Sequence, residues 1–232
     1  MCYRHQRKPP SLPSCAYLIC RGYDSRMGQT IHVMRHGEVE NPKKILYGRQ
    51  SGWHLSERGR DMAEAAADWS KQFNLGAIHA SPLERAQETA QPISKAHGLQ
   101  IETDPRLIEA ANIFEGKKCE LGSGVLKHPA SWWHLRNPWK PSWGEPYVEQ
   151  INRMLAAVFY ARDKAGGKDA LVVSHQLPIW ILRSAIENRS FLHDPRKRIC
   201  SLASVTSVHL DDEGAITGIS YNEPAKHLLP KK

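Results

Sequence analysis

The sequence contains no run of about 18 consecutive apolar residues, the length that a membrane-spanning helix needs. It also lacks the glycine repeat of collagen and the low-complexity composition of a disordered chain. With 232 residues, of which 41% are hydrophobic, the chain is long enough to build a core of its own. These features predict a soluble globular protein with no membrane partner.

Cysteine is scarce and shows no disulfide framework. There are five cysteines, an odd number; three lie in the N-terminal tail, and Cys119 and Cys200 are isolated. This usage favours a reducing compartment, so we expect a cytoplasmic protein. A zinc site formed by the tail cysteines and His5 is an alternative, but their spacing matches no compact ligand motif. We predict neither a metal nor another cofactor.

Acidic residues are too few to balance the basic ones, and the formal net charge is +8. Half of this excess lies in residues 1–26, where five basic residues face one aspartate. The rest is ordinary for a domain that handles anions, and no basic stripe interleaved with aromatic residues lies outside the tail. We therefore expect no nucleic-acid partner.

Residues 1–26 differ in character from the rest of the chain. They are rich in Arg, Pro, Ser and Cys without periodicity, and Pro13 interrupts the apolar residues that a secretory signal would need. A strand-like segment begins just after Met27. We predict a poorly ordered N-terminal extension over 1–26 and a single domain over 27–232.

From residue 27 onward, strand and helix signals alternate. Apolar, β-branched runs predict strands, and apolar residues repeated on one face after a capping residue predict helices. The predicted strands cover 30–34, 77–80, 170–174, 203–210 and 215–221. The predicted helices cover 56–73, a segment that opens at 81–82 and is kinked or split at Pro92, 146–164 and 178–188. This order predicts an α/β fold with one mainly parallel sheet and helices on both faces.

Two helices carry more detailed expectations. Ser81 followed by Pro82 is typical of a capping residue and the first helical position. In the helix over 146–164 we expect the buried side to consist of Val148, Ile151, Leu155, Val158 and Phe159.

The stretch from Ala110 to Pro146 does not fit the alternation. It contains Trp132, Trp133, Trp139 and Trp143. A loop of this length inside a compact domain is usually functional or disordered, and four tryptophans argue against disorder. We predict a Trp-rich lid insertion over 110–146 that covers a site; the alternative is a patch on the core.

Two histidines and two arginines follow three of the predicted strands. Arg35 and His36 end the first strand, Arg85 comes shortly after the second, and His175 follows the central one. Each alone is weak evidence, because a lone histidine or arginine is more often an ordinary core or surface residue. Open α/β sheets bind ligands beyond the carboxyl ends of their strands, so the joint placement predicts a site there.

The segments around these strand ends resemble the histidine phosphatase superfamily, the phosphoglycerate-mutase-like proteins. The matching segments are Arg35-His-Gly-Glu38, Tyr47-Gly48, Leu55-Ser-Glu-Arg-Gly59, Ser81-Pro-Leu-Glu-Arg85-Ala-Gln-Glu-Thr-Ala90, Leu107-Ile-Glu109, Phe114-Glu-Gly116 and Val172-Val-Ser-His175. The resemblance extends from about residue 28 to residue 221 and implies the phosphoglycerate-mutase-like fold. The combination is specific, whereas Arg-His-Gly alone is not.

The resemblance also implies a role for each matched residue. His36 would be the nucleophile that accepts the phosphoryl group, and Glu109 would donate a proton to the leaving oxygen. The family uses no metal. The phosphoryl oxygens would be held by Arg35, Arg85, His175 and Asn41.

The chemistry of phosphate esters supports these roles. Arg35 and Arg85 can neutralise a phosphate dianion with planar, bidentate hydrogen bonds, and a protonated His175 would add a third charge. An imidazole attacks only from a neutral nitrogen, so His36 needs its other nitrogen engaged by an acceptor such as a backbone carbonyl. The leaving alkoxide needs a proton, which a carboxylic acid with a raised pKa provides.

Other side chains compete for these roles. The carboxyl groups of Glu38 and Glu84 are alternatives to Glu109, but we expect both to be structural partners of the arginines. Ser174 beside His175 imitates a nucleophile and its base. Neighbours along a strand point to opposite faces, however, and the sequence has no Gly-x-Ser-x-Gly elbow.

The superfamily includes both mutases and phosphatases. Its glycolytic mutases carry a Glu-Arg-His-Tyr-like run and a later pair of arginines, whereas here Ala110-Ala-Asn112 follows Glu109 and 110–146 has no Arg-Arg pair. We therefore predict a phosphatase, a phosphomonoester hydrolase acting on a small phosphorylated metabolite. The alternatives are a phosphoglycerate-type mutase and a non-catalytic phosphate-binding protein. The oligomeric state stays open, a homodimer included.

Overall fold

The computed structural model describes residues 28–113, 115–116, 144–191, 194 and 197–230. Within them, one six-stranded sheet has the order β3-β2-β4-β1-β5-β6. The first four strands in the chain run parallel to one another, and β5 and β6 are antiparallel to their neighbours. The strands are β1 (Thr30–Arg35), β2 (Leu75–Ala80), β3 (Ile101–Thr103), β4 (Asp169–Ser174), β5 (Val205–Leu210) and β6 (Ile216–Asn222). The helices are α1 (Glu57–Ser70), α2 (Glu84–His97), α4 (Tyr147–Lys164) and α5 (Gln176–Ile186), with short 3-10 helices η2 (Pro105–Leu107) and η4 (Lys226–Leu228).

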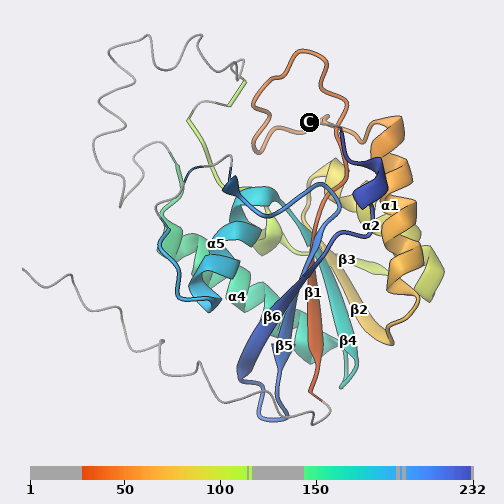
Figure 1. Cartoon of the computed structure of the whole chain (residues 1–232), viewed down its shortest axis with the longest axis vertical. Helices are drawn as coiled ribbons and strands as arrows, with labels where there is room; N and C mark the ends of the chain where they lie inside the picture. Colours follow the sequence, from red (N-terminus) through yellow and green to blue (C-terminus); the bar gives the residue numbers. More distant parts are fainter. Residues whose placement is uncertain (1–27, 114, 117–143, 192–193, 195–196, 231–232) are drawn as a thin grey trace, which may run out of the picture.

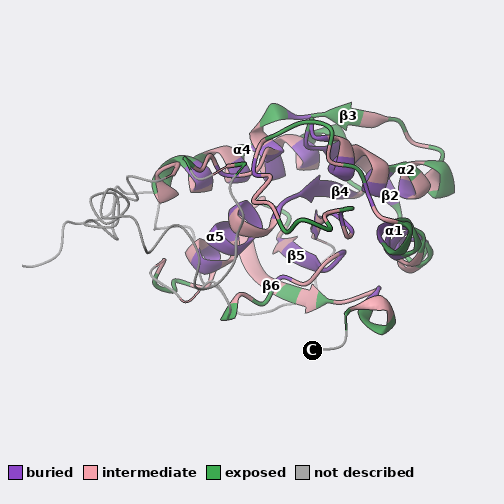
Figure 2. Cartoon of the chain, turned by 90° about the horizontal axis from the view of Figure 1, so that it is seen from above, coloured by how far each residue is buried: buried purple, intermediate pink, exposed green. Residues whose placement is uncertain are grey.

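Helices cover both faces of the sheet, α1 and α2 on one side and α4 and α5 on the other (Figure 1). The central strand β4 shows why. Ala170 and Val172 belong to the core under α4 and α5, whereas Leu171 and Val173 belong to the core under α1 and α2. Successive side chains of a strand point to opposite faces, so an entirely apolar strand needs a cover on each. Figure 2 shows these buried strands between the helices, with exposed residues on the outer face of α1. The predicted α/β fold is confirmed.

Helix α1 begins as the sequence predicts. The hydroxyl of Ser56 accepts a hydrogen bond from the backbone N–H of Gly59 at 3.0 Å, which satisfies one of the donors at the helix start. The helix ends at Ser70, three residues earlier than predicted.

The start of α2 differs from the prediction. The helix begins at Glu84 after Leu83, so Ser81 and Pro82 precede it and do not form its cap. The hydroxyl of Ser81 bonds instead to the ring of His175, 2.7 Å away. This contact joins segments far apart in the sequence, so a rule based on neighbouring residues cannot predict it.

Pro92 lies inside α2 without splitting it. A proline in a helix interior costs about 3 kcal/mol relative to alanine. Here Ala90 and Ile93, two residues before and one after Pro92, are fully buried in the core beneath α1 and α2. We attribute the continuity of the helix to this packing, which outweighs the local preference.

Helix α4 buries a different face from the predicted one. Of the five residues expected inside, only Val158 is fully buried; Leu155 and Phe159 are partly buried, and Val148 is 50% exposed. The buried residues are Gln150, Met154, Ala157, Val158 and Ala161. The face against the sheet is rich in alanine, because a small side chain lets helix and sheet approach closely.

The predicted extension over 1–26 and most of the predicted lid, 117–143, lie outside the described residues. The two ends of the stretch 110–146 are described. Asn112 and Gly144 form an isolated antiparallel bridge, and the N–H of Glu145 donates to the carbonyl of Ala111 at 3.2 Å. The stretch therefore leaves and rejoins the domain at one point, close to Glu109. In the part of the chain described here, no helix has the length and hydropathy to cross a membrane.

Candidate active site

The carboxyl ends of neighbouring parallel strands bring the two predicted histidines together. His36 directly follows β1 and His175 directly follows β4. The strand register pairs Arg35 with Ser174, and the N–H of His36 donates to the carbonyl of Ser174 at 3.1 Å. As a result, the ring centroids of His36 and His175 lie 5.2 Å apart.

The ring of His36 has one nitrogen engaged and the other available. Its Nδ1 lies 2.7 Å from the carbonyl oxygen of Gly37. A carbonyl only accepts, so Nδ1 carries the proton and Nε2 keeps a lone pair. Burial, followed by the charges of Arg85 and Arg35, holds the pKa of His36 well below its usual range. The ring is therefore neutral at neutral pH, as a nucleophile must be.

The turn that carries His36 lies closely against the start of α1. A Cβ on Gly37 would stand 2.6 Å from the carbonyl oxygen of Gly59, and a Cβ on Gly59 would stand 2.0 Å from that of Glu38. Backbone atoms cannot move aside as a flexible side chain can, so both positions require glycine. The N–H of Gly37 also donates to the hydroxyl of Thr89 in α2 at 3.0 Å. These contacts fix the place of His36.

Arg35 and Arg85 each bind one backbone carbonyl and keep further donors unpaired. Arg35 Nη1 donates to Cys200 and Arg85 Nη2 donates to Gly48, both at 2.6 Å. Arg85 is fully buried, with its guanidinium 4.7 Å from the ring centroid of Tyr47. The Nε of Arg35 and the Nε and Nη1 of Arg85 are buried without a partner among the described residues. Buried cationic donors without partners are costly, which indicates an anion site.

His175 faces the same site from the other side. Its Nε2 lies 2.7 Å from the hydroxyl of Ser81, and its buried Nδ1 has no partner within the described ranges. Burial, followed by the charges of His36 and Arg85, holds the pKa of His175 well below its usual range. At neutral pH the ring is thus neutral and does not supply the third positive charge suggested by phosphate chemistry. A phosphate dianion beside it would raise this pKa.

Glu109 comes two residues after η2 and is partly buried. Its Oε1 accepts a hydrogen bond from the N–H of Ala110 at 2.8 Å. Burial raises the pKa of Glu109, and this effect outweighs the lowering by that bond and by Arg85 and Arg35. The carboxyl is thus within electrostatic reach of both arginines. A raised pKa is what a proton donor at neutral pH requires.

The two competing carboxyl groups have other partners. Glu38 accepts hydrogen bonds from Arg58 and Ser56, and the bond from Arg58 is the main cause of its lowered pKa. Glu84 accepts from the N–H of Gly52 at 3.0 Å, and this bond lowers its pKa. Both are ionised at neutral pH. Neither carboxyl group bonds to the site arginines, so the expectation that they orient those arginines is wrong.

Asn41 uses its side chain to close a turn. Its Nδ2 donates to the carbonyl of Ile45 at 2.8 Å, and its Oδ1 accepts from the N–H of Ile45 at 2.9 Å. Both polar ends of the side chain are therefore engaged with one residue. Its predicted hydrogen bond to phosphate stays a prediction.

Two residues of the site carry no role in the sequence analysis. Tyr47 packs on the guanidinium of Arg85, and burial raises the pKa of its phenol. Burial lowers the pKa of Arg198, and its charge interacts with that of Glu109. The Tyr47-Gly48 pair is one of the segments that resemble the family, so the sequence could have pointed to Tyr47 as a site residue. Arg198 lies in a loop without a recognisable motif, so the sequence gives no such indication for it. Across the described residues, no three His, Cys, Asp or Glu side chains are grouped to hold a metal ion.

Comparisons with known proteins match most of the chain. The family model of the histidine phosphatase superfamily (branch 1) matches residues 31–222. "Uncharacterized protein Rv0525" of Mycobacterium tuberculosis is 51% identical over 195 residues, which cover 84% of this chain and 96% of the relative. "Probable phosphoglycerate mutase GpmB" of Escherichia coli is 28% identical over 191 residues, covering 75% and 83%. The solved structure of "Bacillus stearothermophilus YhfR" matches with a TM-score of 0.67 at 26% identity, covering 82% of this chain and 95% of that one.

Proposed function

The chain belongs to the histidine phosphatase superfamily, and we propose that it is a metal-independent phosphatase that hydrolyses phosphomonoesters of small metabolites through phosphohistidine at His36. One observation carries the proposal. The Nδ1 of His36 is engaged by the carbonyl of Gly37, next to guanidinium donors of Arg35 and Arg85 that have no partner in the described part of the chain. A neutral nucleophilic nitrogen beside unpaired cationic donors suits a phosphate ester dianion.

In the first step, the Nε2 lone pair of His36 forms a bond to phosphorus while the bond from phosphorus to the ester oxygen breaks. Arg35 and Arg85 stabilise the charge on the phosphoryl oxygens. The carboxyl of Glu109 gives its proton to the departing oxygen, so the alcohol leaves neutral.

In the second step, the Glu109 carboxylate takes a proton from water as the water oxygen bonds to phosphorus. The bond between phosphorus and Nε2 breaks, and inorganic phosphate leaves. His36 returns to its neutral form and Glu109 to its protonated form, so the cycle closes without a metal or another cofactor.

A phosphoglycerate-type mutase is the second candidate, favoured by the 28% identity to the probable mutase GpmB. A mutase returns the phosphoryl group to the substrate and needs a cation for the carboxylate of a triose acid. The residues after Glu109, Ala110-Ala-Asn112, bring no such charge. A protein that only binds phosphate would need no proton donor with a raised pKa.

The test is hydrolysis of p-nitrophenyl phosphate in the presence of EDTA. We expect wild-type activity to persist in EDTA and to disappear in His36→Ala. His54→Gln is a matched control, because this exposed histidine lies on the loop after β1 and bonds to Glu88 outside the site. It should keep wild-type activity.

Mass spectrometry after a rapid quench without acid tests the intermediate. The added phosphoryl mass should appear on His36 during turnover. A label on another side chain, or hydrolysis that never labels the protein, would overturn the proposal. Tight phosphate binding without turnover would support the binding protein, and phosphoryl exchange between phosphoglycerates would support the mutase.

A further inference from the structure

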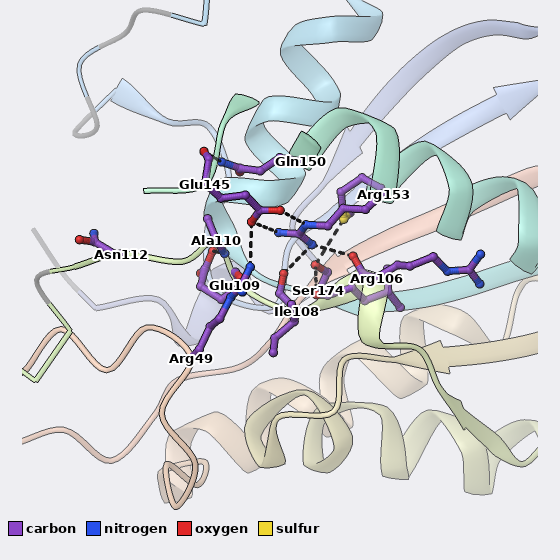
Figure 3. A network of polar contacts seen from close by, with 12 residues as sticks. Arg49, Arg106, Ile108, Glu109, Ala110, Asn112, Glu145, Gln150, Arg153 and Ser174 are labelled. Carbon is purple, nitrogen blue, oxygen red and sulfur yellow. Dashed lines mark hydrogen bonds and ion pairs between the residues drawn. The ribbon is translucent and has the colours of Figure 1, made fainter. Parts of the chain in front are cut away.

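Glu145 joins two arginines at the point where the stretch 110–146 rejoins the domain (Figure 3). Its Oε2 lies 2.8 Å from Nη2 of Arg49 and 2.9 Å from Nη2 of Arg153, and its Oε1 lies 2.7 Å from Nε of Arg153. Only 11% of the Glu145 side chain and 15% of the Arg153 side chain are exposed. The bidentate geometry fixes the orientation of both charged groups.

The same two arginines also bind the backbone that leads to Glu109. Four successive carbonyl groups, those of residues 106–109, each accept a hydrogen bond from a side chain (Figure 3). Arg49 Nε donates to the carbonyl of Glu109 at 2.7 Å. Arg153 Nη1 donates to the carbonyls of residues 106 and 108 at 2.6 and 2.7 Å, and the hydroxyl of Ser174 donates to that of residue 107 at 2.7 Å.

We propose that Glu145 is a positioning residue for proton donation by Glu109. It acts through Arg49 and Arg153, whose orientation it sets, and these in turn hold the backbone of residues 106–109. The carboxyl of Glu109 follows this backbone, since its Oε1 is bound to the N–H of Ala110. The inference rests on the proposed function, in which Glu109 is the acid.

Proton transfer makes a demand that folding does not. The donor oxygen must reach hydrogen-bond distance of the leaving oxygen, and a displacement of about 1 Å is enough to lower a rate greatly. Carbonyls of an irregular segment bond to water equally well when they are exposed. Nearly buried ion pairs, moreover, contribute little net stability compared with apolar packing. Precise placement of Glu109 explains the arrangement better than stability does.

The test is the leaving-group dependence of Glu145→Gln. This substitution keeps the size of the side chain and removes its charge, and an amide presents donors as well as an acceptor to the two guanidinium groups. We expect kcat/KM for phenyl phosphate to fall by about tenfold, because phenolate is a poor leaving group that needs the proton. For p-nitrophenyl phosphate, whose leaving group needs little protonation, kcat/KM should stay within about threefold of the wild type.

Glu187→Gln is the matched control. Glu187 also lies between two arginines, 3.2 Å from Arg183 and 3.0 Å from Arg189, and it does not bond to residues 106–109. Its loss should leave the ratio of the two kcat/KM values unchanged. Arg49→Gln is a second test variant, because Arg49 is on a loop with 35% of its side chain exposed. It should reproduce the selective loss even if Glu145→Gln fails to fold.

Parallel measurements on Glu109→Gln distinguish a failure of the positioning role of Glu145 from a failure of the acid role of Glu109. If Glu109→Gln loses activity selectively on phenyl phosphate while Glu145→Gln and Arg49→Gln do not, the positioning role is wrong and the proposed function stands. If Glu109→Gln slows both substrates equally, Glu109 is not the acid, and that part of the proposed function fails. Equal losses on both substrates in Glu145→Gln would show a merely structural role.

Discussion

Arg85 and Arg153 are both well buried, yet their surroundings are opposite. Arg85 binds one carbonyl and packs on Tyr47, and two of its nitrogens have no partner among the described residues. All three nitrogens of Arg153 are engaged, two of them by the carboxylate of Glu145 and the third by two carbonyls. A buried charge left without partners indicates where an anionic ligand binds, whereas a charge with all its partners holds the backbone in place.

The carboxyl groups of the two regions, Glu109 near the anion site and Glu145 beside Arg153, also differ in how many partners they have. Glu109 has a single hydrogen bond, and burial raises the pKa of its carboxyl. Glu145 bonds to two guanidinium groups and is an acceptor only. In the proposed mechanism, the anion site contains the groups that react, and the network around Glu145 contains the groups that hold them. The predictions below test this division.

The largest effect is expected for Arg85→Gln. Removing a cationic donor from the phosphoryl oxygens should lower kcat/KM for p-nitrophenyl phosphate by about 10² to 10³. The melting temperature should stay equal or rise, because the substitution also removes a poorly compensated buried charge. Steady-state kinetics and thermal unfolding measure the two quantities. A marked loss of stability would mean that Arg85 is a structural residue like Arg153.

Arg153→Met should show the opposite profile. It leaves the carboxylate of Glu145 nearly buried with one partner fewer, and the carbonyls of residues 106 and 108 without their donor. Breaking such a pair costs about 3 to 5 kcal/mol of unfolding free energy. Urea unfolding checks this value, while the affinity for inorganic phosphate should change little. Wild-type stability in this variant would contradict the division into an anion site that reacts and a network that holds it in place.

Inorganic phosphate should stabilise the folded protein through the anion site alone. At a concentration of 100 times its Kd, a ligand raises the unfolding free energy by about 2.7 kcal/mol. We expect this gain in the wild type and in Glu145→Gln, and expect it to vanish in Arg85→Gln at the same concentration. Thermal unfolding with and without phosphate measures it. Equal stabilisation of all three proteins would place the bound anion elsewhere.

The pH dependence of kcat/KM should distinguish proton donation from nucleophilic attack. The pKa of His36 is lowered, so its ring stays neutral well into the acidic range. The pKa of Glu109 is raised, so the acid is present below that pKa and is lost as the pH rises through it. For phenyl phosphate, kcat/KM should fall about tenfold per pH unit above that point.

p-Nitrophenyl phosphate serves as the control for this pH profile. Its kcat/KM should fall much less above the pKa of Glu109, because nitrophenolate leaves without a proton. The ratio of the two values removes any titration that the substrates share. In Glu109→Gln the ratio should become independent of pH, and a ratio that still falls would assign the proton to another group.

The sequence predicts that the histidines and arginines of the candidate site lie together, because local signals mark them. His36, Arg85 and His175 follow strong strand signals, and parallel strands bring their carboxyl ends to one edge of the sheet. The neutral nitrogen of His36 was required by its chemistry, and the carbonyl of Gly37 meets that requirement.

The supporting groups could not be found in this way. Glu145, Arg49 and Arg153 lie in three separate segments and meet only through the folded backbone. Ser81 shows the same limit. Its sequence motif is also typical of a helix cap, and its contact with His175 arises only because the folded chain brings the two residues together. The face of α4 was mispredicted because large apolar residues look more buried than alanine, although close packing favours the small residue.

The smallest effect on stability and activity is expected for Glu38→Gln. This variant tests whether a carboxyl group outside the proposed reaction affects proton donation. The bond from Arg58 lowers the pKa of Glu38, so its contribution to stability is present above the pKa of the unfolded chain and is lost as the pH falls through the folded pKa. Because the pair is partly exposed, the loss at pH 7 should be at most about 1 kcal/mol, and it should disappear in acid. Unfolding at the two pH values measures it. The ratio of kcat/KM for phenyl and p-nitrophenyl phosphate should stay at the wild-type value, since Glu38 is ionised at neutral pH and has no proton to give; a changed ratio would make Glu38 the acid in place of Glu109.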